Sequence, residues 1–253
     1  MTPDRQHALD LMTPGQSASA PLQERLDGVI HELLASFPNP AHLSAADRRG
    51  IIARYSAVLE GNFIYWMTAT YLAVESDEAH AIIEDNLREE VRDNHPGMLR
   101  KFAMAADAMP TDSDALAVNR DLQGVRQFVA QLSPVKTVLM MAFFEGWITR
   151  FMAYLADLAR RQGSAEFEYT DVHGVVDVVH TAGLLRALEA EMARLDPAAA
   201  EPPTVLLTGV ETLRALIETV IRPAGAVTPR LAVEAAAAGP RIIHEIESAP
   251  AAA

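Results

Sequence analysis

The chain has 253 residues, of which half are hydrophobic, and its 21 basic and 34 acidic side chains give a net charge of −13. This composition excludes an intrinsically disordered chain and disfavours binding to nucleic acid or to an anionic membrane. Because cysteine is absent, disulfides, thiolate metal sites and cysteine nucleophiles are excluded, and any metal must be held by His, Asp and Glu.

The two ends of the chain differ from its centre in composition. Residues 1–19 are polar and are expected to form a flexible tail, and residues 223–253 are of low complexity and are expected to form a second one. The N-terminus has no apolar signal core, and no uninterrupted apolar run reaches membrane-spanning length. We therefore expect one cytoplasmic domain over residues 20–222.

Apolar residues recur at helical spacing throughout this domain, and strand-like alternation does not occur. Capping residues and prolines mark the ends of the expected helices. In chain order these helices cover about residues 22–37, 44–74, 77–92, a segment starting at 96, 113–132, 133–161, 166–195 and 203–221. The sequence therefore predicts an all-α fold, a single bundle of seven to nine helices.

The segment DVHGVVDVVH carries His173, Asp177 and His180. At 3.6 residues per turn these three side chains share one helical face. The valines between them indicate a buried helix. Burying an acid between two imidazoles is costly unless something binds all three, and a metal is the simplest such partner. The alternative is a core aspartate that is hydrogen-bonded to one histidine.

Two further acids lie in strongly apolar segments. Glu145 lies in VLMMAFFEGWITRFM, so it should be neutral, paired or metal-bound. Pairing with Arg150 is disfavoured because a five-residue offset puts the two side chains on different faces. Glu60 lies in SAVLEGNFIYWMTATYLAV, and its alternative role is a hydrogen bond in helix packing.

The segment NLREEVRDNHP supplies Glu89, Glu90 and His95. Most of its charges are typical of a solvated helix surface. Asn94 and Pro96 indicate a helix break, which would let His95 fold back toward the same centre as the preceding glutamate. With the residues above, this inventory suits two divalent metals. The ferritin-like Glu-x-x-His pair is absent, so such a site would need another ligand order.

That order resembles the haem-oxygenase-like dimetal oxidases, helical proteins with the haem oxygenase and thiaminase-like fold that bind two irons in place of haem. Their pattern is a Glu, then a Glu near an N-x-x-E-E turn with a His shortly after, then a Glu on an apolar helix, and finally H-x3-D-x2-H. The resemblance covers about residues 44–195. The matching residues are Glu60, Glu90, His95, Glu145, His173, Asp177 and His180. Glu89 remains an alternative to Glu90, because the loop before His95 is short.

The resemblance implies that these seven residues bind two irons, with one carboxylate bridging, and that O2 reacts there through a peroxo-diiron(III) species. Carboxylates combined with imidazoles match iron or manganese better than calcium, so manganese is an alternative metal. Relatives often form homodimers, so the resemblance is compatible with a homodimer, while the sequence itself leaves the oligomeric state open. The electron donor is not indicated.

Known family substrates imply oxidation of a small aliphatic amino acid or a derivative in natural-product biosynthesis, by desaturation, cyclisation, C–C or C–N cleavage, or N-oxygenation. One alternative is oxidative decarboxylation of a fatty acid, and another is a non-catalytic ligand-binding or regulatory protein. An amino-acid carboxylate requires a cation, but helical offsets place none of the candidates clearly on the ligand face; these are Lys136, Arg54, Arg150 and Arg186. Residues near the ligands are expected either to line the substrate cavity or to pack in the core; these are Phe63, Ile64, Met67, Met141, Ile148, Thr149, Met152 and Tyr169.

Overall fold

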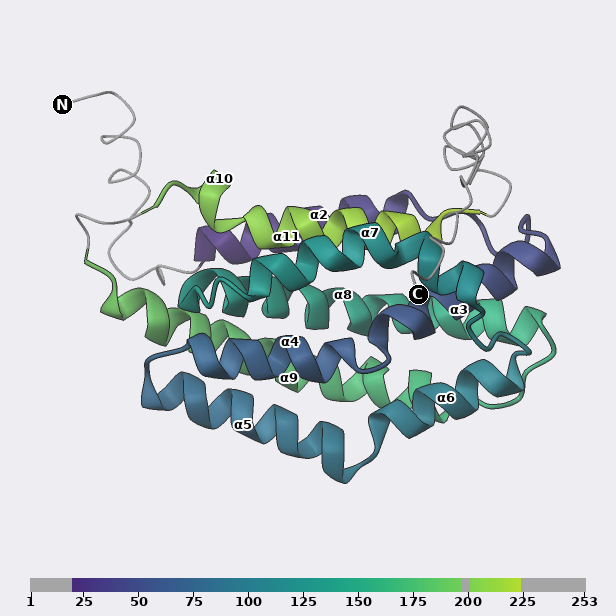
Figure 1. Cartoon of the computed structure of the whole chain (residues 1–253), viewed down its shortest axis with the longest axis horizontal. Coiled ribbons are helices and arrows are strands. Elements are labelled where there is room, and N and C mark those ends of the chain that lie inside the picture. The colour runs from purple at the N-terminus through teal and green to yellow at the C-terminus, as the bar shows by residue number, and fades with distance from the viewer. Residues whose placement is uncertain (1–19, 197–200, 224–253) are drawn as a thin grey trace, which may run out of the picture.

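The computed structural model describes residues 20–196 and 201–223 (Figure 1). All regular secondary structure in these residues is helical, with nine helices of at least eleven residues and the four-residue α10, which confirms the all-α prediction. The expected tails at residues 1–19 and 223–253 lie outside the described residues, except for Pro223. The helices are α2 (Ala20–Ala35), α3 (Ala45–Leu59), α4 (Asn62–Ala73), α5 (Asp77–Arg92), α6 (His95–Ala105), α7 (Asp112–Val129), α8 (Pro134–Arg161), α9 (Glu168–Arg194), α10 (Pro203–Leu206) and α11 (Thr208–Ile221).

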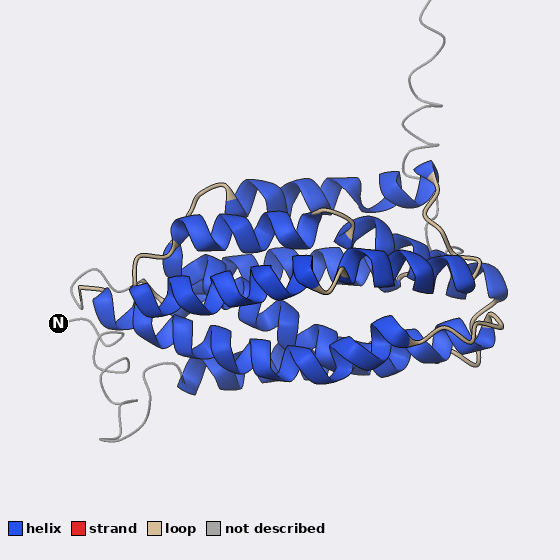
Figure 2. Cartoon of the chain, turned by 90° about the horizontal axis from the view of Figure 1, so that it is seen from below, coloured by secondary structure: helices blue, strands red, loops and turns tan. Residues whose placement is uncertain are grey.

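Helix α8 is the central element of the bundle. In Figure 1, α2, α7 and α11 lie on one side of it, and α4, α5, α6 and α9 lie on the other. The helices run roughly along the long axis of the molecule (Figure 2). The most apolar part of α8 has the length and hydropathy of a membrane span, but 72% of that window is buried inside the bundle. This burial is typical of a core helix, and its most extensive contact is with α9.

Several helix starts follow from side-chain capping of free backbone N–H groups. Ser44 and Asp47 form a capping box at the start of α3, where the sequence predicts it. Helix α5 is capped by Ser76, whose hydroxyl accepts a hydrogen bond from the backbone N–H of Ala79. Asp77 is the first helical residue of α5, as the predicted range of 77–92 has it.

The helix predicted over residues 44–74 is two helices, and the prediction of a single one is wrong. Helix α3 ends at Leu59 with Glu60 as its C-cap, and Gly61 has a left-handed backbone with φ 76°. Glycine adopts this conformation at little cost because it has no Cβ. Helix α4 then begins at Asn62. Apolar spacing continues on both sides of the turn, so periodicity alone conceals the break.

A second left-handed turn separates α5 from α6, where the sequence predicts a break. Asn94 has φ 54°, and α6 begins at His95 with Pro96 in its first turn. Asparagine tolerates this conformation better than most residues that carry a Cβ. Because the chain bends sharply here, the side chain of His95 at the start of α6 lies beside Glu90 in the last turn of α5 (Figure 1).

The Gly61 turn generates a stability prediction. Gly61→Ala should lower the free energy of unfolding by about 1–2 kcal/mol, because a Cβ is strained at positive φ. The matched control is Gly28→Ala in the exposed middle of α2, where an added Cβ meets nothing within 4 Å. That control should be neutral or stabilising by about 0.5–1 kcal/mol. Urea unfolding measures both, and equal stability of Gly61→Ala and wild type would contradict the prediction.

Candidate metal centre

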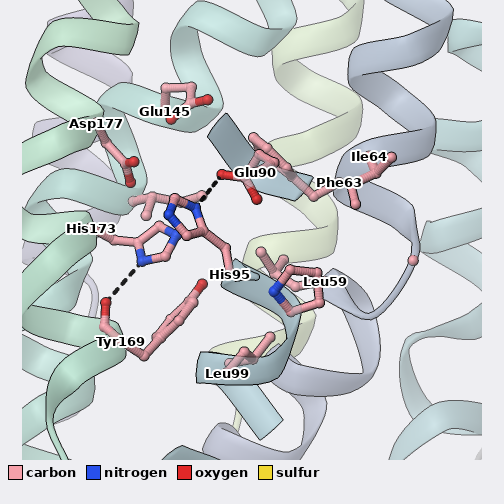
Figure 3. Close-up of a pocket in the computed structure, with 13 residues that line it drawn as sticks. Leu59, Phe63, Ile64, Glu90, His95, Leu99, Glu145, Tyr169, His173 and Asp177 are labelled. Carbon is pink, nitrogen blue, oxygen red and sulfur yellow. Dashed lines mark hydrogen bonds and ion pairs between the residues drawn. The ribbon is translucent and has the colours of Figure 1, made fainter. Parts of the chain in front are cut away.

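Four helices bring six of the predicted ligands into two neighbouring groups. In each group the candidate ligand atoms lie within 4.8 Å of one another, and all six residues are buried. Helices α5, α6, α8 and α9 contribute them (Figure 3). The first group is Glu90, His95 and His173, and the second is Glu145, Asp177 and His180.

The first group is organised by two hydrogen bonds. His95 Nδ1 lies 2.7 Å from Glu90 Oε1, and the rings of His95 and His173 are 4.5 Å apart between centroids. His173 Nδ1 donates to the backbone carbonyl of Tyr169 at 2.8 Å, one turn earlier on α9. A carbonyl only accepts, so this bond places the ring proton on Nδ1 and the lone pair on Nε2. A fixed tautomer of this kind is typical of a metal-ligating histidine.

Burial and the contact with Glu90 together determine the protonation of the two histidines in the first group. Burial lowers the pKa of His173 to about 4, so this imidazole is neutral at pH 7 and its lone pair is available. Burial alone would also lower the pKa of His95, but the hydrogen bond and the negative charge of Glu90 outweigh it and raise that pKa.

The second group contains polar atoms that the described residues leave unsatisfied. His180 Nδ1 is 3.8 Å from Glu145 Oε2 and 3.7 Å from Asp177 Oδ1, which is too far for a hydrogen bond. Glu145 Oε1, Asp177 Oδ2 and His180 Nδ1 are all buried without a hydrogen-bond partner. Such atoms are costly, and a single cation between the three side chains would satisfy all of them.

The pKa values of the second group also show the cost of burying these three side chains together. Burial raises the pKa of both Glu145 and Asp177, because each carboxylate is removed from water close to another acid. Burial would lower the pKa of His180, but Glu145 and Glu89 raise it to about 9. Arg150 gives no compensation, since it pairs with Asp27 on the surface, in agreement with the sequence argument against a Glu145–Arg150 pair. The donor set of oxygens and imidazole nitrogens therefore fits iron.

Glu89 and Glu90 both reach the centre but have different neighbours. Glu90 is buried in the first group, whereas Glu89 is half-buried and its Oε2 lies 3.1 Å from His180 Nε2. Since His180 Nδ1 faces the second group, the contact on the opposite nitrogen orients the ring. This contact gives Glu89 a positioning role that the sequence analysis did not consider.

Glu60 is the one predicted ligand that the structure does not bring into either group. It lies at the turn between α3 and α4 and forms an ion pair with Arg100 of α6. The two side chains are 50% and 60% exposed. The break at Gly61 explains this position, because it ends α3 before Glu60 can follow the buried face of that helix.

A pocket that opens to solvent is lined by all the residues of the two metal groups except His180. Of the predicted lining residues, Phe63, Ile64, Ile148 and Tyr169 line it. The others have different positions: Met67, Met141 and Met152 are buried in the core, and the Thr149 hydroxyl donates to the backbone carbonyl of Glu145. The pocket also includes Leu59, Pro96 and Leu99, which the sequence pattern did not indicate as lining residues.

The expectation that α9 is buried all round is wrong. Val175, Val178 and Val179 are 70%, 55% and 70% exposed. Helix α9 packs against α8, α5 and α6 with its ligand-bearing face, and these valines lie on its outer face. Valine is compatible with either environment, so its presence did not establish which side of the helix is covered.

A family model matches residues 53–204, which is more than half of the chain. The family is named after haem oxygenase and is described as iron-containing redox enzymes. The chain belongs to this family. The matched region contains all six residues of the two groups, and the resemblance to haem-oxygenase-like oxidases is confirmed at this level. No curated protein and no solved structure matches the chain. The family description and the two groups together support iron as the metal.

In the metal-free protein, the buried acids should contribute less to stability as pH rises, which is the reverse of what carboxylates in ion pairs do. Because burial raises the pKa of Asp177 above its ordinary value of about 3.9, the folded state binds that proton more tightly than the unfolded state does. The contribution of Asp177 to stability should therefore fall as pH rises above about 4. With chelator present, Asp177→Asn should be more stable than wild type at pH 7, by on the order of 1 kcal/mol, with the difference vanishing near pH 4. Urea unfolding at pH 4–8 measures this, and wild type being the more stable at pH 7 would refute it.

Metal titration distinguishes the roles of Glu89 and Glu90 on α5. Glu90→Gln should remove one iron per chain, since it takes a carboxylate out of the first group. Glu89→Gln should keep the stoichiometry but weaken binding by roughly 10–100-fold, as loss of an orienting contact does. Iron(II) titration under argon measures both. Glu84→Gln, an exposed acid paired with Arg88, is the control. A full iron lost in Glu89→Gln but not in Glu90→Gln would reverse the assignment.

Proposed function

We propose that this chain is an O2-dependent non-haem di-iron oxidoreductase that oxidises a small aliphatic amino acid or an amino-acid-derived compound. The observation that carries the proposal is the pair of adjacent buried groups, each with three oxygen or nitrogen donors, beside one pocket. Membership of an iron-containing redox family supports the class of chemistry. Unsatisfied donor atoms deep in the core argue against a purely structural or regulatory role for these residues.

In this proposal Glu90, His95 and His173 hold one iron, and Glu145, Asp177 and His180 hold the other. When bound, the iron pair supplies the oxidising power of O2, and manganese is an alternative metal. Glu60 completes the ligand set by turning inward from its turn. Its ion pair with Arg100 is exposed, so breaking that pair costs about 1 kcal/mol or less.

The pocket accounts for how a substrate would be held. Phe63, Ile64, Leu99 and Ile148 give it apolar walls, which exclude water and hold an aliphatic chain against the metal groups. We expect desaturation, cyclisation, bond cleavage or N-oxygenation within a natural-product pathway. The apolar lining also favours the alternative substrate class, a fatty acid undergoing oxidative decarboxylation.

Iron reconstitution tests the proposal. Full-length protein loaded with iron(II) under argon should bind about two irons per chain, and mixing with O2 and aliphatic amino acids should give a transient visible absorption and an oxidised product detected by mass spectrometry. His173→Ala and Glu145→Ala should lose iron and activity, because each removes a buried donor. His31→Ala, which changes an exposed histidine of α2, is the matched control.

The proposal fails if wild type binds fewer than one iron per chain under every condition and both ligand variants behave like it. Two bound irons without oxidation of amino acids, but with oxidation of fatty acids, would favour the alternative substrate class instead.

A further inference from the structure

A second hollow lies directly beside the metal pocket. Leu59, Pro96 and Leu99 line both, so the two hollows meet at these apolar side chains. In Figure 3, Leu59 and Leu99 project from different helices toward the space below Glu90 and His95. The outer hollow is also lined by Glu60 and Arg100. A route therefore leads from the metal groups, past apolar side chains, to a cation at the surface.

We propose that Arg100 binds the carboxylate of the substrate at the outer end of this route, with the aliphatic part of the substrate passing Leu59 and Leu99 toward the metal groups. The inference deepens the proposed function and rests on it, since it assigns the substrate class of the same site. It makes Arg100 a specificity-determining residue.

The first support is the partner that Arg100 already has. Its guanidinium pairs with the carboxylate of Glu60, so the site accepts a carboxylate without further adjustment. Guanidinium groups stay charged at all relevant pH values and present paired N–H donors that match the two oxygens of a carboxylate. Since both side chains are half exposed or more, a substrate carboxylate displaces Glu60 at small cost.

The second support is the position of the other cations. Among the described residues that line the two hollows, Arg100 is the only lysine or arginine. Lys136 pairs with Glu201, and the buried Arg54 donates to the carbonyl of Val220 at the end of α11. Neither lines the route, so the cation that an amino-acid substrate requires comes from α6.

Glu60 is both the partner of Arg100 and a proposed metal ligand, so carboxylate binding at Arg100 is coupled to the inward movement of Glu60. While Glu60 is paired with Arg100 it is held away from both metal groups. A substrate carboxylate that takes its place releases Glu60 to turn inward, and an inward Glu60 leaves Arg100 free for the carboxylate. By linkage, each event favours the other to the same degree.

The position of Arg100 limits which carbon is oxidised. Arg100 follows His95 by five residues, which is about 7.5 Å along the axis of α6. Its side chain is 60% exposed, whereas that of His95 is 2% exposed. A carboxylate held at Arg100 is thus at the surface while the reaction takes place in the core. The oxidised carbon is then several bonds from the carboxyl group, which disfavours decarboxylation.

Isothermal titration of the full-length chain without metal tests the binding role directly. The probes are norleucine, hexanoate and hexanamide, which share an aliphatic chain of the same length. Wild type should bind the two carboxylates but not the amide. Arg100→Gln should weaken carboxylate binding about tenfold or more, and Arg100→Lys should fall between the two. Glu60→Gln should strengthen hexanoate binding, because it removes the competing carboxylate.

Arg88→Gln, which changes an exposed arginine paired with Glu84 on α5, is the matched control and should bind like wild type. Equal binding of hexanoate and hexanamide by wild type, no binding of either carboxylate, or unchanged binding in Arg100→Gln overturns the proposal. Should Arg100→Gln not fold, no gain for hexanoate in Glu60→Gln overturns it. Tighter binding of norleucine identifies an amino acid as the source of the carboxylate, and tighter binding of hexanoate identifies a fatty acid. No iron is present, so failure of the di-iron proposal is detected separately.

Discussion

The burial of Glu145 and Asp177 in the same apolar core is the constraint on which the rest of the structure depends. Two acids and His180 meet between α8 and α9 with three polar atoms unsatisfied. Removing such groups from water costs several kcal/mol unless a partner compensates them. The packing of the two longest helices imposes that cost on the metal-free protein. The same packing makes a bound cation stabilising, so metal affinity and folding are coupled.

The two left-handed turns decide what surrounds this core. Asn94 turns the chain so that His95 lies beside Glu90, which completes the first group from two consecutive helices. Gly61 ends α3 and leaves Glu60 on the surface with Arg100. The turn at Asn94 therefore places His95 in the first group. The turn at Gly61 keeps Glu60 outside both groups but within reach of the pocket. Local backbone conformation sets both outcomes.

Much of this arrangement was predictable from the sequence, because helical periodicity and caps are local properties. The triplet on α9 shares a face by helix geometry, and the apolar neighbours of Glu145 indicate its burial. The rest depends on tertiary contacts. Val175 and Val179 are as apolar as core residues, and only the absence of a helix over them among the described residues makes them exposed. The break at Gly61 is hidden by continuous periodicity, and Arg100 meets Glu60 from 40 positions away.

Helix α9 supplies ligands to both groups from one continuous helix. Its rise of about 1.5 Å per residue puts His173 roughly 6 Å along the axis from Asp177, so the geometry of this helix sets the spacing of the two groups. Loops do not enter this spacing. The walls of the two hollows come largely from the ends of α3, α4 and α6, beside the turns at Gly61 and Asn94. Under the proposed function, the metal groups and the substrate walls therefore belong to different parts of the bundle. Changes in the turns would then alter which substrate is admitted and leave the spacing of the metal groups unchanged.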